Sequence, residues 1–330
     1  MIYGKFAPFI HTDRTVSYME LSFLIALLPC VCYAVFKYGV RAVLLILCCS
    51  LMNVLFAVLF AKTKKDAGKS PENVVALSKS VGEMWILAGG QLAGATDDAL
   101  ELEEVKNAVS IGTTHTASFE AIIALNPDFV IMTQDIPSHK KLYSNLLSVG
   151  IKVYIADVKD FADYEKVLQD FTNYTGRKDL YQKNVLEVLK AIEKVISDFS
   201  KASGSQEKRS ASYLFLRVSG TKNKVLKEHF GNEIFQNLGL KSIVDDDSGL
   251  DEIGIEAIVG TDPDYIFVVY QGNQKNAQDS FYKAYQSNPA WKGLSAVKNN
   301  RVQILPKELF NFKPNARWAE AYQVVVDLIK

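Results

Sequence analysis

Residues 118–131 read Ser-Phe-Glu-Ala-Ile-Ile-Ala-Leu-Asn-Pro-Asp-Phe-Val-Ile, and residues 254–267 read Gly-Ile-Glu-Ala-Ile-Val-Gly-Thr-Asp-Pro-Asp-Tyr-Ile-Phe. The two stretches align without a gap, so that Glu120 in the first corresponds to Glu256 in the second. The copies lie too far apart for a solenoid repeat, and their separation suits two related lobes. The chain is therefore predicted to contain two similar halves.

Both copies predict the same local structure, which is a short helix, a turn and a strand. The turn is formed by residues 126–128 (Asn-Pro-Asp) in the first copy and by residues 262–264 (Asp-Pro-Asp) in the second. Because proline cannot continue a helix and restricts the residue before it, the position of each turn is well determined. The β-branched and aromatic run after each turn predicts a strand that is buried on both faces.

Each copy also carries one glutamate near the start of its helix, Glu120 or Glu256. A glutamate at this position favours the positive end of the helix dipole, which is a purely structural role. A matched pair with one acid in each lobe also suits a contact with a two-fold symmetric partner. Both interpretations stay open at this point.

The composition argues against a nucleic-acid partner. The 330 residues suffice for two domains and additional segments, and the 37 basic and 37 acidic residues give a formal net charge of zero. No basic face is expected to follow a phosphate backbone. Outside the apolar first sixty residues there is no disulfide framework and no zinc-type cysteine spacing, because all four cysteines lie in that part: Cys30, Cys32, Cys48 and Cys49.

The histidines do not suggest a catalytic site. An enzyme would need a nucleophile with its base or a metal cluster. The four histidines are scattered along the chain instead, at His11, His115, His139 and His229. We therefore expect a binding protein with no catalytic residue, no metal site and no cofactor.

Two apolar runs near the N-terminus, residues 21–36 and 42–61, predict a membrane segment. About 20 apolar residues span a bilayer, so the second run qualifies and the first, which Pro29 would kink without excluding it, is marginal. A cleavable signal peptide is not expected, because the apolar stretch is long and lacks a small-residue cleavage site. We predict two transmembrane helices in a hairpin within residues 1–61, followed by a polar linker at residues 62–70.

This N-terminal segment resembles the start of the D subunit of Rnf-type ion-translocating electron-transport complexes. The resemblance covers about residues 1–60 and rests on residues 7–14, 25–29 and 38–42. The remaining membrane helices of that subunit and its flavin-attachment motif have no counterpart here. The redox role is therefore not implied, and the segment is expected to serve as an anchor.

The rest of the chain predicts an α/β fold, because short β-rich runs alternate with helical patterns. Such an alternation favours two lobes with mainly parallel sheets. The pattern between the lobes is helical, with apolar residues recurring every three or four positions, and it predicts one long interlobe helix. We accordingly place the first lobe at residues 71–162, the interlobe helix at 163–203 and the second lobe at 204–330.

This organisation resembles the helix-linked class of substrate-binding proteins of ABC importers, which serve siderophores, haem and cobalamin. The resemblance covers about residues 72–330 and implies an iron chelate or cobalamin in the interlobe cleft and a permease dimer with its ATPase subunits as partner. It further implies that Glu120 and Glu256 dock the lobes onto that permease. It rests on both repeat copies and on residues 74–78, Glu83, 87–90, 288–291, 297–299 and 313–318.

Several polar residues are expected at the cleft, because open α/β sheets bind ligands at the carboxyl ends of their strands. Basic side chains among them would suit an anionic ligand such as a ferric siderophore or a haem propionate. For His115 a capping or packing role is an alternative, and Arg317 is also expected to pair internally. The predicted ligand contacts are Lys79, Thr114, His115, Arg217, Tyr270, Lys313 and Arg317.

The membrane topology stays open. A domain that captures substrate must face outward, so we expect a cell-membrane protein with an extracytoplasmic binding domain. A two-helix hairpin, however, puts residues 62–330 on the same side as the N-terminus, and the lysines of the linker predict a cytoplasmic side. Two other functions therefore remain as alternatives, a fragment of an Rnf-type membrane subunit and a membrane-tethered ligand sensor.

Overall fold

The computed structural model describes residues 37, 39, 73–133, 135–202, 210–244 and 253–330. The chain divides into two units, residues 1–69 and 70–330, and every helix and strand named below belongs to the second. The predicted transmembrane helices and the linker at 62–70 lie outside the described residues. Within the described residues, no helix is both long enough and apolar enough to cross a bilayer.

The first lobe is built on a fully parallel five-stranded sheet with the strand order β3-β2-β1-β4-β5. Its strands are β1 (Val74–Ala76), β2 (Gly94–Ala95), β3 (Val109–Ser110), β4 (Phe129–Met132) and β5 (Lys152–Ile155). Its helices are α3 (Lys79–Leu87), α4 (Phe119–Ala124) and α5 (Pro137–Ser148), with short 3-10 turns at Ala99–Glu101 and Glu103–Val105. The central strands β1 and β4 are buried throughout, which explains their unbroken apolar sequences.

The second lobe contains a mainly parallel sheet with the order β10-β9-β6-β7, in which β7 is antiparallel and β8 also pairs with β6. The strands are β6 (Ser212–Val218), β7 (Asn223–Val225), β8 (Lys241–Ser242), β9 (Tyr265–Tyr270) and β10 (Val302–Ile304). The helices are α9 (Phe230–Asn237), α10 (Ile255–Thr261), α11 (Gln274–Phe281), α12 (Ser295–Lys298), α13 (Lys307–Phe310) and α14 (Trp318–Ile329). The predicted α/β fold with parallel sheets is therefore confirmed.

The two repeat copies adopt the same structure. Helices α4 and α10 are each followed by a residue in the left-handed region, Asn126 with φ 45° and Asp262 with φ 41°, before strands β4 and β9 begin. The aspartate after each proline then accepts a hydrogen bond from the start of the neighbouring strand. Asp128 Oδ2 accepts from the Asn73 N–H at 3.0 Å, and Asp264 Oδ2 accepts from the Ser212 N–H at 2.8 Å. The Pro-Asp pair thus ties two parallel strands together at the same point in each lobe.

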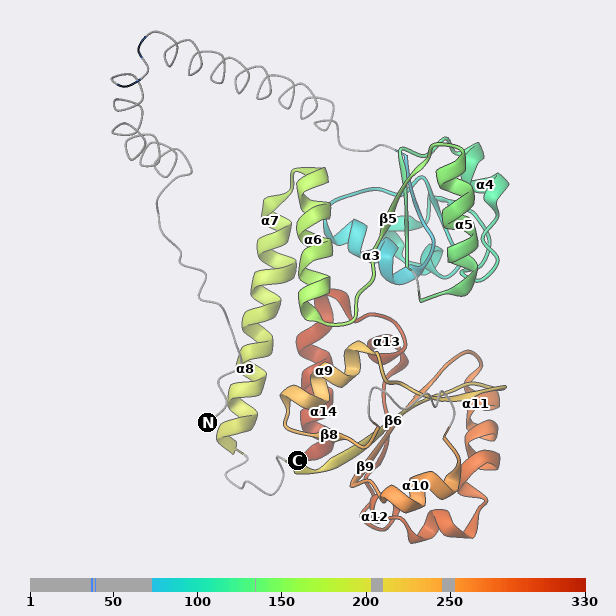
Figure 1. Cartoon of the computed structure of the whole chain (residues 1–330), viewed down its shortest axis with the longest axis vertical. Coiled ribbons are helices and arrows are strands. Elements are labelled where there is room, and N and C mark those ends of the chain that lie inside the picture. Colours follow the sequence, from blue (N-terminus) through green and yellow to red (C-terminus); the bar gives the residue numbers. More distant parts are fainter. Residues whose placement is uncertain (1–36, 38, 40–72, 134, 203–209, 245–252) are drawn as a thin grey trace. The chain divides into compact units, whose positions relative to one another are not determined.

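The connection between the lobes differs from the single helix predicted at 163–203. Helix α6 (Phe161–Thr175) ends at Gly176, whose φ of 73° is the left-handed conformation that terminates helices. A second helix then runs through α7 (Lys178–Tyr181), a π turn (Gln182–Leu186) and α8 (Glu187–Ala202). Figure 1 shows α6 and α7 side by side, so the connection is a helical hairpin of which only the second arm runs from one lobe to the other. The prediction of one continuous helix is wrong.

A continuous apolar core joins the hairpin to both lobes. Helix α14 lies along α8 (Figure 1). The ring of Trp318 contacts Phe161 of α6 and Phe230 of α9, with centroids 5.6 and 5.5 Å apart. The packing of large aromatic rings at these distances disfavours sliding of the lobes relative to each other. The cleft described below therefore has well-defined walls.

Glu233 connects the second lobe to this hairpin. Because it is buried, we expect it to make the free energy of unfolding depend on pH. Its carboxylate accepts a hydrogen bond from the Phe161 N–H at 2.8 Å, and burial raises the pKa of Glu233 from 4.5 to about 7. Between these two values the folded state binds the proton more tightly than the unfolded state, so this residue makes stability fall as pH rises. The stability lost above pH 7 is about 1–2 kcal/mol once partial solvent screening is allowed for.

Glu233→Gln keeps an acceptor for the Phe161 N–H and removes the buried charge. We expect its thermal unfolding midpoint to exceed that of the wild type by a few degrees at pH 8 and to match it at pH 4.5, as measured by circular dichroism. The exposed Glu193→Gln on α8 is the matched control and should shift neither midpoint. An equal shift at both pH values would contradict the assignment.

Candidate functional site

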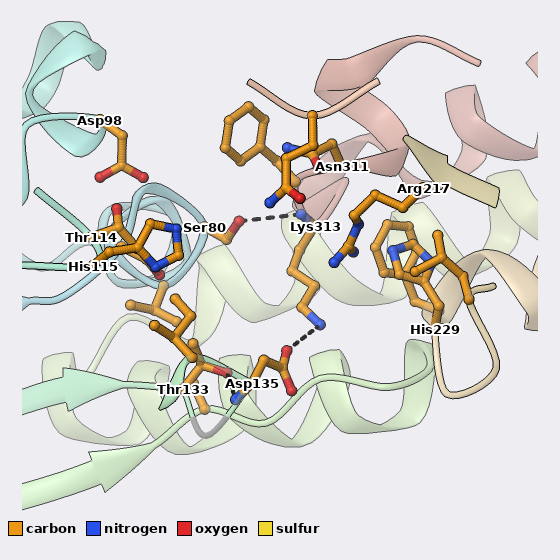
Figure 2. Close-up of a pocket in the computed structure, with 18 of the residues that line it drawn as sticks. Ser80, Asp98, Thr114, His115, Thr133, Asp135, Arg217, His229, Asn311 and Lys313 are labelled. Carbon is orange, nitrogen blue, oxygen red and sulfur yellow. Dashed lines mark hydrogen bonds and ion pairs between the residues drawn. The ribbon is translucent and has the colours of Figure 1, made fainter. Parts of the chain in front are cut away.

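A cavity of about 960 Å³ lies between the lobes, at the carboxyl ends of their strands (Figure 2). This is where ligands bind in open α/β sheets, because several loops converge there. The first lobe contributes the start of α3 and the segments that follow β2, β3, β4 and β5. The second lobe contributes β6, the segment from β7 to α9, and the chain after α13.

Arg217 is the most informative residue of the cavity. It sits near the end of the central strand β6, and its side chain points into the cavity (Figure 2). The Nε atom is fully enclosed and has no hydrogen-bond partner, and no ion pair formed by the described residues includes Arg217. Burial lowers the pKa of Arg217, and the charge of Asp135 offsets this only in part. A buried guanidinium without a bonded anion is costly, so the site is suited to an anion that comes from elsewhere.

Lys313 crosses the cavity from the second lobe to the first. Its ammonium group lies 3.3 Å from Asp135 Oδ2 and also donates to the carbonyl oxygen of Val158. Its backbone N–H donates to Ser80 Oγ at 3.2 Å. A second ion pair, between Lys159 and Glu228 at 2.7 Å, also connects the lobes. These contacts keep the lobes close together around the cavity.

Two histidines form hydrogen bonds with backbone groups in the segments around the cavity. In the first lobe, the ring nitrogens of His139 lie 3.1 Å from the Thr133 carbonyl and 3.0 Å from the Thr114 carbonyl, and burial lowers its pKa. In the second lobe, His229 Nδ1 accepts from the Gly231 N–H at 3.0 Å. Burial, followed by the nearby Arg217 and Lys313, holds the pKa of His229 well below its usual value. Burial thus lowers the pKa of both rings.

Four of the predicted ligand contacts line the cavity: Thr114, His115, Arg217 and Lys313. They come from the loop after β3, from β6 and from the chain after α13, and Figure 2 shows them around the same space. That they contact a ligand remains a prediction.

The other three predicted contacts, Lys79, Tyr270 and Arg317, are not among the lining residues. Lys79 forms an ion pair with Glu101 at 2.9 Å, and Arg317 forms a two-bond ion pair with Glu320 at 2.7 and 2.8 Å. The internal pairing that was the alternative for Arg317 is therefore present. Tyr270 ends strand β9, and it is the following residue that reaches the cavity.

Other residues that line the cavity were not predicted as ligand contacts, because no sequence pattern marked them. Some follow strands of only two or three residues, which no periodicity can reveal, and His229 reaches the cavity only because α9 folds back onto β6. The polar or charged residues missed in this way include Asp98, Asp135, Lys224, Lys227 and His229. Within the described part of the chain, no cluster of three or more histidine, cysteine or acidic side chains is arranged to hold a metal ion.

Glu120 and Glu256 occupy equivalent places outside the cavity. Each is exposed in the first turn of its helix, α4 in the first lobe and α10 in the second (Figure 1). Ser118 caps α4 by accepting from the Ala121 N–H at 3.2 Å and donates to Glu120 at the same distance. The positions thus allow one exposed acid per lobe to face a partner.

Two related α/β lobes, a helical connection and a cavity between the strand ends define a two-lobed binding protein. The chain belongs to the periplasmic binding protein family, which it matches over residues 74–309. This is a family of substrate-binding transport proteins and not of enzymes. Residues 4–81 separately match the NQR2, RnfD, RnfE family, in agreement with the N-terminal resemblance.

Among curated relatives, the chain is 27% identical over 247 residues to the Fe(3+)-citrate-binding protein YfmC of Bacillus subtilis (strain 168), covering 72% of this chain and 74% of that protein. It is 22% identical over 280 residues to the putative ABC transporter substrate-binding lipoprotein YhfQ of the same organism, covering 78% of this chain and 83% of that protein.

Among solved structures, S. aureus IsdE complexed with heme has a TM-score of 0.67 and 19% identity, covering 78% of this chain and 98% of that chain. The periplasmic vitamin B12 binding protein BtuF of Vibrio cholerae has a TM-score of 0.64 and 19% identity, covering 79% of this chain and 97% of that chain. At this identity the two structures establish the fold.

Proposed function

We propose that this chain is the membrane-tethered substrate-binding component of an ABC importer. In this proposal it captures an iron chelate, such as a siderophore complex or haem, or alternatively cobalamin, in the interlobe cavity. It then delivers the ligand to a permease dimer with its ATPase subunits. The family membership and the relative named for Fe(3+)-citrate support the class of ligand.

The observation that carries the proposal is the enclosed Arg217 side chain in a cavity of about 960 Å³. Pockets of roughly 300–1,000 Å³ suit drug-sized organic molecules, so a bare ion would leave most of this space unfilled. An anionic chelate would fill the cavity and also supply the charge that the guanidinium lacks. Carboxylate groups meet the fork of an arginine with two parallel hydrogen bonds, which favours carboxylate-rich ligands.

A binding titration tests this proposal. We expect the full-length chain to bind ferric citrate, a ferric siderophore, haem or cobalamin at micromolar or lower concentration in isothermal titration calorimetry. A sugar and a short peptide serve as controls of similar size. Binding of either control, together with no response to any of the four test ligands, would refute the proposal.

The proposed location is the cell membrane, with the binding lobes extracytoplasmic. Its support is the similarity of residues 4–81 to a membrane protein family and the lipoprotein names of two relatives. Protease treatment of intact cells tests this proposal, because external lobes would be cleaved while a cytoplasmic marker stays intact. Protection of the lobes would favour a cytoplasmic role.

The match at residues 4–81 also supports a second candidate function, that of a membrane subunit of an electron-transport complex. This candidate predicts that flavin co-purifies with the chain. The importer component predicts no flavin absorbance in the purified protein, so an absorption spectrum distinguishes the two.

A further inference from the structure

The charged residues that line the cavity are divided by sign between the two lobes. Among the described lining residues, the acidic side chains of the first lobe are Asp97, Asp98, Glu101 and Asp135, and the basic side chains of the second are Arg217, Lys224, Lys227 and Lys313. The second lobe adds one acid, Glu228, which is paired with Lys159. A cavity with one negative and one positive wall favours a ligand whose own charges are separated.

Most of the acids on the first wall already have partners. Glu101 pairs with Lys79 at 2.9 Å, Asp135 with Lys313 at 3.3 Å, and Asp97 Oδ1 accepts from Ser110 Oγ at 2.6 Å. None of these groups therefore requires a ligand.

Asp98 differs from them. Its Oδ2 atom accepts from the Lys79 N–H at 3.1 Å, which holds the carboxylate against the N-terminus of α3, where the helix dipole favours a negative charge. Its Oδ1 atom is enclosed and has no hydrogen-bond partner, and no ion pair of the described residues includes Asp98. A buried acceptor without a partner costs free energy that a donor from a ligand would recover.

Asp98 and Arg217 approach the cavity from opposite sides (Figure 2). The negative charge that partly offsets the burial of Arg217 is that of Asp135 and not that of Asp98. The acid and the guanidinium therefore do not satisfy each other.

We propose that the ligand is dipolar: a cationic ammonium group pairs with Asp98 of the first lobe, and a carboxylate pairs with Arg217 of the second. This inference rests on the proposed capture of a ferric chelate in the cavity, and it narrows the ligand to chelates that carry an amine as well as an acid. An all-carboxylate chelate would satisfy Arg217 and leave Asp98 without its donor.

Three matched chelates test the inference on the unmodified full-length chain. The first is ferrioxamine G, a linear ferric trihydroxamate with an ammonium group at one end and a carboxylate at the other. The second is its N-acetyl derivative, which lacks the ammonium charge, and the third is its methyl ester, which lacks the carboxylate. Ferric citrate, which has no cationic group, is the fourth ligand, and affinities are measured by isothermal titration calorimetry.

We expect N-acetylation to weaken binding by at least ten-fold in the wild type and by less than two-fold in Asp98→Asn. Glu103→Gln, an exposed acid outside the lining that pairs with Lys106, is the control and should behave as the wild type. Equal affinity of the wild type for the parent and N-acetyl chelates would overturn the dipolar assignment, as would equal or tighter binding of ferric citrate. Because the ligands are varied on the wild-type chain, a folding defect in Asp98→Asn cannot produce this result.

Two other outcomes concern the proposed function itself. If esterification does not weaken binding, the anionic end assigned to Arg217 is wrong, whatever the N-acetyl chelate does. If neither the ferrioxamines nor ferric citrate, haem or cobalamin binds, the cavity does not capture this class of ligand, and the dipolar assignment falls with it.

Discussion

The double variant Glu120→Ala with Glu256→Ala is expected to lose about 30-fold in uptake through the cognate permease while its ligand affinity stays unchanged. The two acids are exposed at equivalent positions, one in the first turn of α4 and one in the first turn of α10. A two-fold symmetric permease would contact both lobes through such a pair. An exposed charge pair contributes on the order of 1 kcal/mol, so losing both gives this factor.

Uptake of the radiolabelled ligand in cells measures the effect, and calorimetry on the purified chain measures the ligand affinity. Neither acid lines the cavity, so a change in affinity is not expected. The matched control is Glu187→Ala with Glu193→Ala, which removes two exposed acids from α8 and should transport normally. Normal transport by the Glu120 and Glu256 variant would leave the two residues with a structural role at the helix ends.

Replacing Arg217 by glutamine is expected to weaken the binding of ferric citrate by about 100-fold or more, because hydrogen bonds to a charged group contribute about 1.5–3 kcal/mol each. The same variant should not be less stable without ligand. In the unliganded protein the guanidinium is buried and its Nε atom lacks a partner, so its removal relieves a desolvation cost. Weaker binding together with an equal or higher unfolding temperature is the distinguishing result.

Calorimetry and thermal unfolding by circular dichroism measure the two quantities on the same preparation. Lys222→Gln is the control, because Lys222 is an exposed cation in the turn between β6 and β7 and does not line the cavity. This control should keep both the affinity and the unfolding temperature. A lower unfolding temperature for Arg217→Gln would mean that the arginine holds the fold, and unchanged affinity would mean that another group binds the anion.

Local sequence patterns were sufficient to predict the helix, turn and strand that occur in both repeat copies. The Asx-Pro-Asp turns depend on residue types that act within a few positions. Proline cannot continue the helix, and Asn126 and Asp262 are residue types that tolerate the left-handed conformation both of them adopt. The parallel arrangement of the sheets followed from the alternation of strands with helices. Arg317 could also have been paired from sequence, because Glu320 lies three residues further along the same helix region.

The interlobe connection was predicted less well, although it too is helical. Apolar residues recur with helical spacing on both sides of Gly176, and the periodicity does not reveal that the chain reverses there. No strand was predicted at β2, β7 or β8. Each has only two or three residues, and, unlike the equally short β1, none of them lies within a longer run of β-branched and large apolar residues. Such short strands form only because a neighbouring strand supplies their hydrogen bonds.

The cavity depended most on long-range contacts. The positions of Arg217, Lys313 and Lys79 in the sequence predicted all three near the cleft. Arg217 and Lys313 line the cavity, whereas Lys79 is paired with Glu101 and is not among the lining residues. Asp98 was not selected at all, because its role follows from the approach of the turn after β2 to the N-terminus of α3. The charges and the alternation of strands with helices follow from the local sequence. The order of the strands, the loss of water around a charge and the absence of a partner arise only when distant segments pack together.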